Sequence, residues 1–276
     1  MAGLLDNQVA IITGAGRGIG AAAAKLMAEH GAQVVISDLD PEPAEAVVAG
    51  IKNNGGEATA VCGDVTDPAF PDALMKTTAA TYGKLNILVN NAGFTWDKVV
   101  HKMTDQQWQK IMDVHATAPF RMIRAAAPYM REAAKEEKGS GQTPESRCIV
   151  NVSSTSGIHG NAGQVNYSTA KMGVIGMTKT IAKEWGSFGI RCNAVVFGMI
   201  ETRLTKAKEQ GEEIEVDGEK VALGVPAAML SMAPMLIPLG RTGTPVEAAA
   251  GIFILCLPMC SYITGHVLEV TGGFGI

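Results

Sequence analysis

Short apolar runs alternate with longer helical patterns along nearly the whole chain of 276 residues. The runs are rich in Val and Ile and apolar almost continuously, which is typical of strands covered on both faces. We expect strands at 8–13, 33–38, 58–65, 85–91, 147–154, 190–198 and 266–272, with helices near 18–30, 41–54, 68–83, 104–135, 163–187 and 245–257. This order predicts an α/β fold: one doubly wound parallel sheet with right-handed crossovers and helices on both faces.

No internal repeat or linker divides the chain, so we expect a single domain over residues 1–276. A polar stretch at 135–147 is interpreted as an exposed loop. An insertion at about 202–237 has a charged first half, TKAKEQGEEIEVDGEK, and a Met-rich second half, GVPAAMLSMAPMLIP. A long insertion after a late strand indicates a lid lining an apolar pocket. A pair of packed surface helices or an oligomer contact fits it equally well.

Composition excludes several classes of protein. Hydrophobic residues make up 47% and charged residues 18%, which is globular and not disordered. A net charge of −4 without a long basic run argues against nucleic-acid or anionic-membrane partners. The N-terminus has no signal-peptide pattern and the apolar segment 246–260 is too short to span a bilayer, so we expect a cytoplasmic protein. The scattered cysteines predict no metal site.

A glycine-rich stretch, TGAGRGIG at 13–20, follows the first expected strand and opens the first expected helix. Gly14 permits a tight turn, and Gly18 and Gly20 allow a diphosphate to approach the backbone closely. The helix N-terminus then offers free N–H groups and a partial positive charge to that anion. Ile19 lies in the same turn. This placement after a strand predicts a dinucleotide site.

The second expected strand ends in Asp38, eighteen residues beyond Gly20. A carboxylate there can accept hydrogen bonds from ribose hydroxyls and repels a 2′-phosphate. Leu39 stands where an arginine could have neutralised such a phosphate, so NAD(H) is favoured as the cofactor. Arg17 keeps NADP(H) possible, because a basic residue in the glycine loop could reach a 2′-phosphate.

Three more motifs follow in order: NNAG at 90–93, NVSSTSG at 151–157 and YSTAK at 167–171. With these motifs the chain resembles the short-chain dehydrogenase/reductase family over nearly its whole length. Within the family it is most similar to 3-oxoacyl-(acyl-carrier-protein) reductases and their 17β-hydroxysteroid dehydrogenase relatives. The closest matching segments are GNAGQVNYSTAK at 160–171 and YITGHVLEVTGG at 262–273. The resemblance implies a Rossmann fold and NAD(P)-linked oxidoreduction.

The resemblance also implies catalytic roles. Tyr167 would protonate a carbonyl oxygen or deprotonate an alcohol, and Lys171 would favour ionisation of the phenol and hold the nicotinamide ribose. Ser154 would donate a hydrogen bond to the substrate oxygen. Ser153 is the neighbouring alternative and should point to the other face of the strand.

Further positions match the family's cofactor contacts. Asp64 and Val65 would meet the adenine, and the run Asn91, Ala92 and Gly93 would pass the adenine ribose. A structural role in turns and strand ends is the alternative for both motifs. A loop with Gly198, Ile200 and Thr202 would hold the nicotinamide carboxamide, although Phe197 replaces the proline usual in that turn.

His115 occupies a position where the family's pattern has an asparagine that holds a water of the proton relay. A core histidine is the plain alternative. Histidine both donates and accepts hydrogen bonds and has an unperturbed pKa near 6.5, so a place in or beside the relay is favoured. The ring could also displace the water, or distort the helix before Pro119.

The leading hypothesis is reduction of a ketone, as in a 3-oxoacyl thioester, to the secondary alcohol with NAD(P)H. A hydroxysteroid or other secondary-alcohol dehydrogenase is the alternative enzyme, and a nucleotide-binding subunit or sensor with little catalysis is an alternative of another class. The resemblance implies a homotetramer that contacts its copies through the 104–135 and 163–187 helices. The expected partner is a small-molecule substrate.

Overall fold

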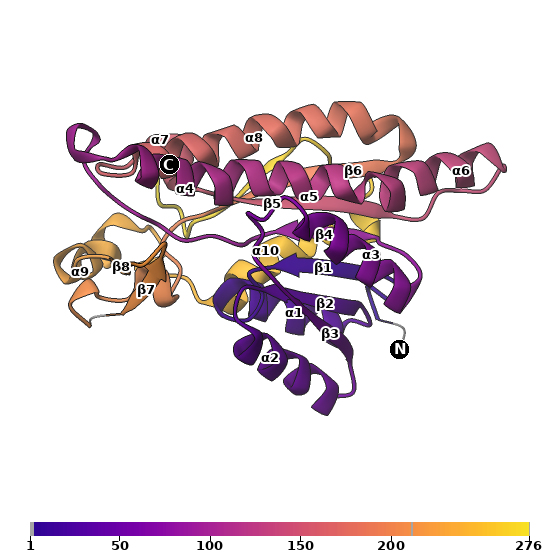
Figure 1. Ribbon diagram of the computed structural model, residues 1–276, viewed down its shortest axis with the longest axis horizontal. Helices are drawn as coiled ribbons and strands as arrows, with labels where there is room; N and C mark the ends of the chain where they lie inside the picture. The colour runs from indigo at the N-terminus through magenta and orange to yellow at the C-terminus, as the bar shows by residue number, and fades with distance from the viewer. Residues whose placement is uncertain (1–2, 211, 276) are drawn as a thin grey trace.

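The computed structural model describes residues 3–210 and 212–275. Its main sheet is built from β1 (Val9–Thr13), β2 (Gln33–Asp38), β3 (Glu57–Cys62), β4 (Ile87–Asn90), β5 (Arg147–Ser154), β6 (Ile190–Phe197) and β9 (Val267–Val270). These strands pair in parallel in the order β3-β2-β1-β4-β5-β6-β9. The predicted doubly wound parallel sheet is therefore confirmed (Figure 1).

Helices cover both faces of this sheet, as Figure 1 shows. One face packs against α1 (Gly18–Glu29), α2 (Pro41–Asn53) and α10 (Pro245–Cys256). The other lies under α3 (Phe70–Tyr82), α4 (Asp105–Met112), α5 (Ala118–Ala127), α6 (Ala133–Gly139) and α8 (Val165–Trp185). Successive residues of β1 enter opposite cores: Ile12 packs on the first face and Ile11 on the second. This two-sided burial explains why the strands are almost continuously apolar.

The strand order reverses between β1 and β4, because β2 and β3 extend the sheet on one side and β5, β6 and β9 on the other. In open parallel sheets a ligand binds at such a point, beyond the carboxyl ends of the strands. The loops that leave β1, β2, β4, β5 and β6 all emerge at this edge. No helix among residues 3–210 and 212–275 is long and apolar enough to span a membrane.

The helix predicted over 104–135 is helical from Asp105 to Gly139, with two π-helical interruptions. The first, Asp113–Thr117, joins α4 to α5, and the second, Pro128–Glu132, joins α5 to α6. Pro119 has no N–H to donate to the carbonyl of His115 four residues earlier, so the α-helical pattern is broken there. The expected exposed loop is shorter than 135–147, because α6 takes its first residues and β5 its last.

The insertion contains an antiparallel hairpin, β7 (Glu213–Val216) and β8 (Glu219–Ala222), followed by α9 (Ala227–Leu236). Asp217 and Gly218 form the turn with φ of 51° and 81°, a left-handed pair suited to a two-residue hairpin. The alternative of two packed helices is therefore wrong for the charged half. The sequence does carry a signal for this hairpin, because apolar and charged residues alternate on both sides of the Asp217-Gly218 pair.

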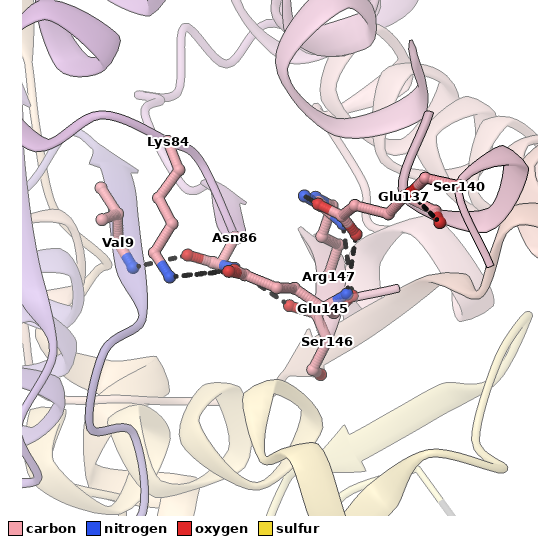
Figure 2. Close-up of polar contacts among 8 residues, drawn as sticks. All are labelled: Val9, Lys84, Asn86, Glu137, Ser140, Glu145, Ser146 and Arg147. Carbon is pink, nitrogen blue, oxygen red and sulfur yellow. Dashed lines mark hydrogen bonds and ion pairs between the residues drawn. The ribbon is translucent and has the colours of Figure 1, made fainter. Parts of the chain in front are cut away.

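A polar network joins elements at the opposite, amino-terminal edge of the sheet (Figure 2). Arg147, only 3% exposed, donates to Glu137 at the end of α6, with Nη1 2.8 Å from Oε2. Glu145 accepts from Lys84 and from Asn86 Nδ2, at 2.9 and 2.8 Å. Asn86 in turn accepts from the backbone N–H of Val9 at 3.0 Å. The network thus ties α6 to the starts of β1, β4 and β5.

A short helix, α7 (Thr155–His159), follows β5 directly and was not expected. Ser154 is its N-cap and accepts from the backbone N–H of Ser156 at 3.2 Å. The helix separates Ser154 from the segment that leads into α8. Its five residues are too few for periodicity to reveal in the sequence.

Candidate active site

The glycine-rich turn forms a close-packed cradle between β1 and α1. Gly14 has a φ of +62°, and a Cβ there would lie 2.7 Å from Cα of Ala92, so only glycine fits. Gly18 also has a positive φ, of +55°. Arg17 is the N-cap of α1 and contributes no side-chain cap, and the first turn holds no acidic residue. The free N–H groups of α1 therefore suit a dinucleotide diphosphate.

Carboxylates dominate the end of β2. Asp38 accepts from Gly16 N through Oδ2 at 2.7 Å and from Asp40 N through Oδ1 at 3.1 Å. Asp40 pairs with the guanidinium of Arg17 at 2.7 Å. Leu39 is 66% exposed and adds no charge. The cation that kept a 2′-phosphate possible is thus paired, at the exposed surface, with a carboxylate that the sequence reasoning did not single out.

The carboxylates at the end of β2 also act on a neighbouring thiol, that of Cys62. Burial raises the pKa of Cys62 at the end of β3, and the carboxylates of Asp38, Glu45 and Asp40 raise it further. Each of these three groups acts on the same small region beside β2. A ligand bearing another phosphate would therefore meet repulsion here.

The end of β4 holds the glycine-rich turn in place. Thr13 Oγ1 accepts from the backbone N–H groups of Asn91 and Ala92, at 3.0 and 3.1 Å. Asn91 Nδ2 donates to the carbonyls of Thr13 and Gly14, at 2.9 and 3.0 Å. These residues lie where a cofactor contact was expected, and their side chains support the cradle.

The turn after β3 is held in a similar way. Asp64 Oδ1 accepts from the backbone N–H and the hydroxyl of Thr66, at 2.8 and 2.7 Å. Val65 packs partly against the core beneath α3 and α5. Their expected contact with adenine stays a prediction.

The loop after β6 reaches back over the glycine-rich turn. Gly198 lies against β9, where a Cβ would come 3.1 Å from Cα of Thr271. Ile200 is buried and its carbonyl accepts from the hydroxyl of Thr205. A Cβ on Gly18 would be 3.7 Å from Cγ2 of Thr202. Of the three residues predicted for the nicotinamide end of the cofactor, Thr202 therefore lies beside the predicted diphosphate cradle.

Ser154, Tyr167 and Lys171 meet beyond the end of β5. The Ser154 side chain lies close enough to the Tyr167 phenol to lower its pKa. Lys171 Nζ lies 5.6 Å from the centre of the Tyr167 ring and donates to the carbonyl of Val152 at 2.8 Å. Ser153 points to the other side, where Oγ donates to the carbonyl of Lys171 at 2.7 Å. The geometry thus favours Ser154 over Ser153 as the serine of the set.

Burial shifts both ionisable groups of the set. It raises the pKa of Tyr167 to about 12; the Ser154 side chain lowers that pKa in part, and the Asp97 carboxylate raises it. Burial lowers the pKa of Lys171 to about 7. The expected lowering of the phenol pKa by the lysine is therefore not found, because desolvation of the phenolate dominates.

His115 lies in the π-helical segment beside this set. Its ring meets the Tyr167 ring edge to face, with centroids 4.9 Å apart and planes at 87°. Nε2 donates to the carbonyl of Phe94 at 2.7 Å. Burial holds the pKa of His115 well below its usual range, the charge of Lys171 lowers it further, and the bond to Phe94 raises it in part. The distortion expected before Pro119 is present.

An apolar cluster surrounds the phenol of Tyr167. It consists of buried Trp96, Ile111, Ala170 and Val221 with partly buried neighbours, among them Tyr167 and Ile214. Val221 and Ile214 come from the hairpin of the insertion. Sequence reasoning missed Trp96 and the hairpin residues, because only the fold brings these distant segments together.

Asp97 is a second missed residue near the phenol. Its Oδ2 accepts from Gln164 Nε2 at 2.8 Å. Burial raises its pKa, while that hydrogen bond and the nearby Lys208 lower it. Asp97 thus links the loop after β4, the start of α8 and the insertion, and no sequence motif marked it.

The chain matches the model of the short chain dehydrogenase family over residues 8–213. It is 39% identical over 273 residues to a 3-oxoacyl-[acyl-carrier-protein] reductase of Synechocystis sp., covering 98% of this chain and 97% of that protein. A 3-oxoacyl-[acyl-carrier-protein] reductase FabG of Thermotoga maritima is 37% identical over 99% of both chains.

A differently named relative, the short-chain reductase protein NovJ of Streptomyces niveus, is 35% identical over 97% of this chain and 94% of its own. Both the family match and the relatives extend across the glycine-rich turn, the serine-rich strand end and the Tyr-Lys pair. The chain belongs to the short-chain dehydrogenase family, and the resemblance inferred from its motifs is confirmed.

Proposed function

We propose that this enzyme uses NAD(H) to reduce the ketone of a 3-oxoacyl thioester to the secondary alcohol. The observation that carries the proposal is the meeting of Ser154, Tyr167 and Lys171 at the carboxyl edge of the sheet, beside a cradle that fits a dinucleotide. The 3-oxoacyl substrate class is supported by the names of several relatives that match over nearly the whole chain.

The proposed mechanism assigns each group one task. A bound nicotinamide supplies the hydride for the carbonyl carbon. Tyr167 keeps its proton until charge develops on the substrate oxygen, because burial raises its pKa to about 12. Ser154 acts on the same phenol and would hold the substrate oxygen from a second side. Lys171 would bring positive charge close to the forming phenolate.

We propose NAD(H) rather than NADP(H) as the cofactor. Asp38 stands at the end of β2, and its carboxylate is oriented by two backbone N–H groups. Arg17 is occupied by Asp40 and so is not a free cation. A 2′-phosphate would lie beside the carboxylates of Asp38 and Asp40, whereas ribose hydroxyls can donate hydrogen bonds to Asp38.

We propose that the insertion is a lid over the substrate and not an oligomer contact. Val221, 4% exposed, and Ile214 pack on the cluster that holds Tyr167. The hairpin turn is tied to α4 by an ion pair between Lys110 and Asp217 at 2.8 Å. The hairpin therefore packs on the same apolar cluster as the phenol. We also propose that residues 1–276 form a single domain.

We also propose a homotetramer that uses the α4–α6 segment and α8. Phe120 on α5 is 49% exposed and Met172 on α8 is 52% exposed. A Cβ on Gly173 or Gly176 would meet nothing within 4 Å, so that face of α8 is open. Multi-angle light scattering of the purified chain should give four times the chain mass of 28.8 kDa, and a monomer mass contradicts this assembly. The cytoplasmic location stays a prediction.

One kinetic comparison tests the reaction and the cofactor together. NADH and NADPH oxidation is followed with acetoacetyl-CoA and longer β-keto thioesters, and separately with steroid and simple ketones. We expect turnover on the thioesters, faster with NADH, and its near-complete loss in Tyr167→Phe. Steroid turnover without thioester turnover would favour the hydroxysteroid alternative. Tight NADH binding without turnover on any ketone would favour the nucleotide-binding subunit or sensor.

A further inference from the structure

The ring of His115 connects the π-helical segment Asp113–Thr117 to the ring of Tyr167. It is 3% exposed and touches the phenol edge to face. On its other side it is tied to Phe94, in the loop after β4. The ring therefore bridges two segments that both border the proposed site.

The hydrogen bond to Phe94 fixes the tautomer of the ring. A carbonyl oxygen only accepts, so Nε2 must carry the proton. In the neutral ring Nδ1 is then a bare acceptor, and it is buried with no partner within the described residues. Within the described residues neither ring nitrogen is hydrogen-bonded to Tyr167 or Lys171, so these contacts provide no direct proton path between the ring and the phenol.

The backbone around the ring is shaped for a ring at this place. The π-helical segment Asp113–Thr117 adds a residue to the turn that carries His115. Gly93 lies against the Cε1 atom of the ring, where a Cβ would overlap Cε1 and come 2.8 Å from Nδ1. Pro119 accounts for the π-helical turn, and the glycine at the point of contact is a local cost that the packing of this ring explains.

We propose that His115 is a positioning residue that holds the phenol of Tyr167 in place and covers it from water, and that it carries no proton in the reaction. This proposal rests on the proposed function, in which Tyr167 is the general acid. The ionisable groups around the ring agree with this role: Lys171 from α8 opposes its protonation, Asp97 from the loop after β4 acts on Tyr167, and Asp113 on its own segment is bonded to Gln109 at 2.8 Å.

Three substitutions separate a positioning ring from a proton carrier. His115→Phe keeps a ring but removes both nitrogens, His115→Gln keeps hydrogen-bonding groups but removes the ring, and His115→Ala removes both. We expect His115→Phe to retain kcat within about tenfold, the worth of one hydrogen bond. His115→Ala should lose about 100-fold through displacement of Tyr167, with His115→Gln close to it. KM for NADH should not change, and neither should the pH dependence of kcat in His115→Phe.

The opposite ranking overturns the proposal. If His115→Gln is more active than His115→Phe, or if His115→Phe shifts the pH dependence of kcat, the residue carries a proton. Thermal unfolding and NADH binding of each variant identify any that fail to fold, and His159→Phe at the end of α7 is the matched control.

A measurement without substrate keeps this test separate from the proposed reaction. In protein labelled with 13Cζ-tyrosine, the Tyr167 signal is assigned by its absence in Tyr167→Phe. We expect it to stay in the phenol form up to pH 10 in the wild-type protein and in His115→Phe. In His115→Ala, water reaching the phenol should lower its pKa toward the ordinary value near 10, so the signal begins to shift. An unchanged signal in His115→Ala contradicts the covering role even if no substrate is turned over.

Discussion

Lys171 is the residue whose ionisation should set the pH dependence of the proposed reaction. Burial lowers its pKa from 10.5 to about 7, so the ammonium is present below neutral pH and is lost as the pH rises through 7. Tyr167, with a pKa of about 12, remains protonated over this range. We therefore expect kcat/KM for ketone reduction to fall as the pH rises through about 7.

The matched variant for this prediction is Lys171→Arg. Arginine stays charged at every accessible pH, so the decline near pH 7 should disappear, even though the larger head group lowers the rate. Steady-state rates with NADH between pH 5.5 and 9 make the measurement. A decline near pH 7 that persists in Lys171→Arg would mean that another group causes it.

Asp40 should determine how strongly the enzyme discriminates against NADPH. In Asp38→Ser/Asp40→Asn the carboxylate beside the ribose is gone and Arg17 is released from its pair. A freed guanidinium can make a charge-assisted bond to a 2′-phosphate, which corresponds to a gain of about 10- to 100-fold. We expect the ratio of kcat/KM for NADPH to that for NADH to rise by this factor.

The single variants and a control sharpen this prediction. Asp38→Ser alone should raise the ratio less, because Asp40 still holds Arg17. Glu42→Gln, in the first turn of α2, removes one carboxylate nearby without touching the pair and should leave the ratio unchanged. Equal ratios in Asp38→Ser and in the double variant would show that Asp40 plays no part.

Among the secondary-structure elements, the β7–β8 hairpin should control entry of the substrate. Its contact with α4 includes the exposed ion pair of Lys110 and Asp217. Lys110→Gln should weaken the closed position and raise KM for the thioester by about twofold, since exposed ion pairs are weak. KM for NADH should be unaffected, because the cofactor cradle lies on other elements.

Lys220→Gln is the control for the hairpin. It removes a pair with Glu213 at 3.5 Å that lies within the hairpin and does not reach α4. At 1 M salt, screening should remove the difference between wild type and Lys110→Gln. A KM change of the same size in both variants would point to altered hairpin stability and away from a latch on α4.

At the scale of the whole molecule, the network of Figure 2 should account for much of the decrease in the free energy of unfolding at acid pH. Hydrogen bonds from Arg147 hold the pKa of Glu137 below its usual range. A lowered carboxyl pKa stabilises the fold above the unfolded value near 4.3, and this contribution is lost as the pH falls through the folded value. Glu137→Gln should thus reduce the free energy of unfolding by about 2 kcal/mol at pH 7.

The difference between wild type and Glu137→Gln should shrink steadily below about pH 4.3, where the wild-type carboxylate is protonated as well. Urea unfolding at pH 7 and at several lower pH values measures this. Glu136→Gln is the control, because Glu136 is exposed one residue away. A constant difference down to pH 3 would show that the ionisation of Glu137 contributes nothing.

Much of the fold and of the site could be predicted from the sequence, and the exceptions have physical causes. The glycines, Asp38 and the Tyr167–Lys171 pair stand at fixed distances along single strands, turns or helices, so local pattern reveals them. Trp96 and Val221 meet only because the insertion folds back onto the loop after β4. Asp40 escaped notice because its importance lies in a side-chain pairing with Arg17 and not in its spacing.

By itself the sequence determined the order of strands and helices, the parallel sheet, the family and the residues of the proposed catalytic set. These depend on hydrophobic period and on groups that are neighbours along the chain. Only the tertiary structure decided that Arg17 pairs with Asp40, that the insertion contains a hairpin on the cluster around Tyr167, and that His115 donates to Phe94. It also reversed the expected pKa of Tyr167, because desolvation depends on all the elements that surround the phenol and not on Lys171 one turn away.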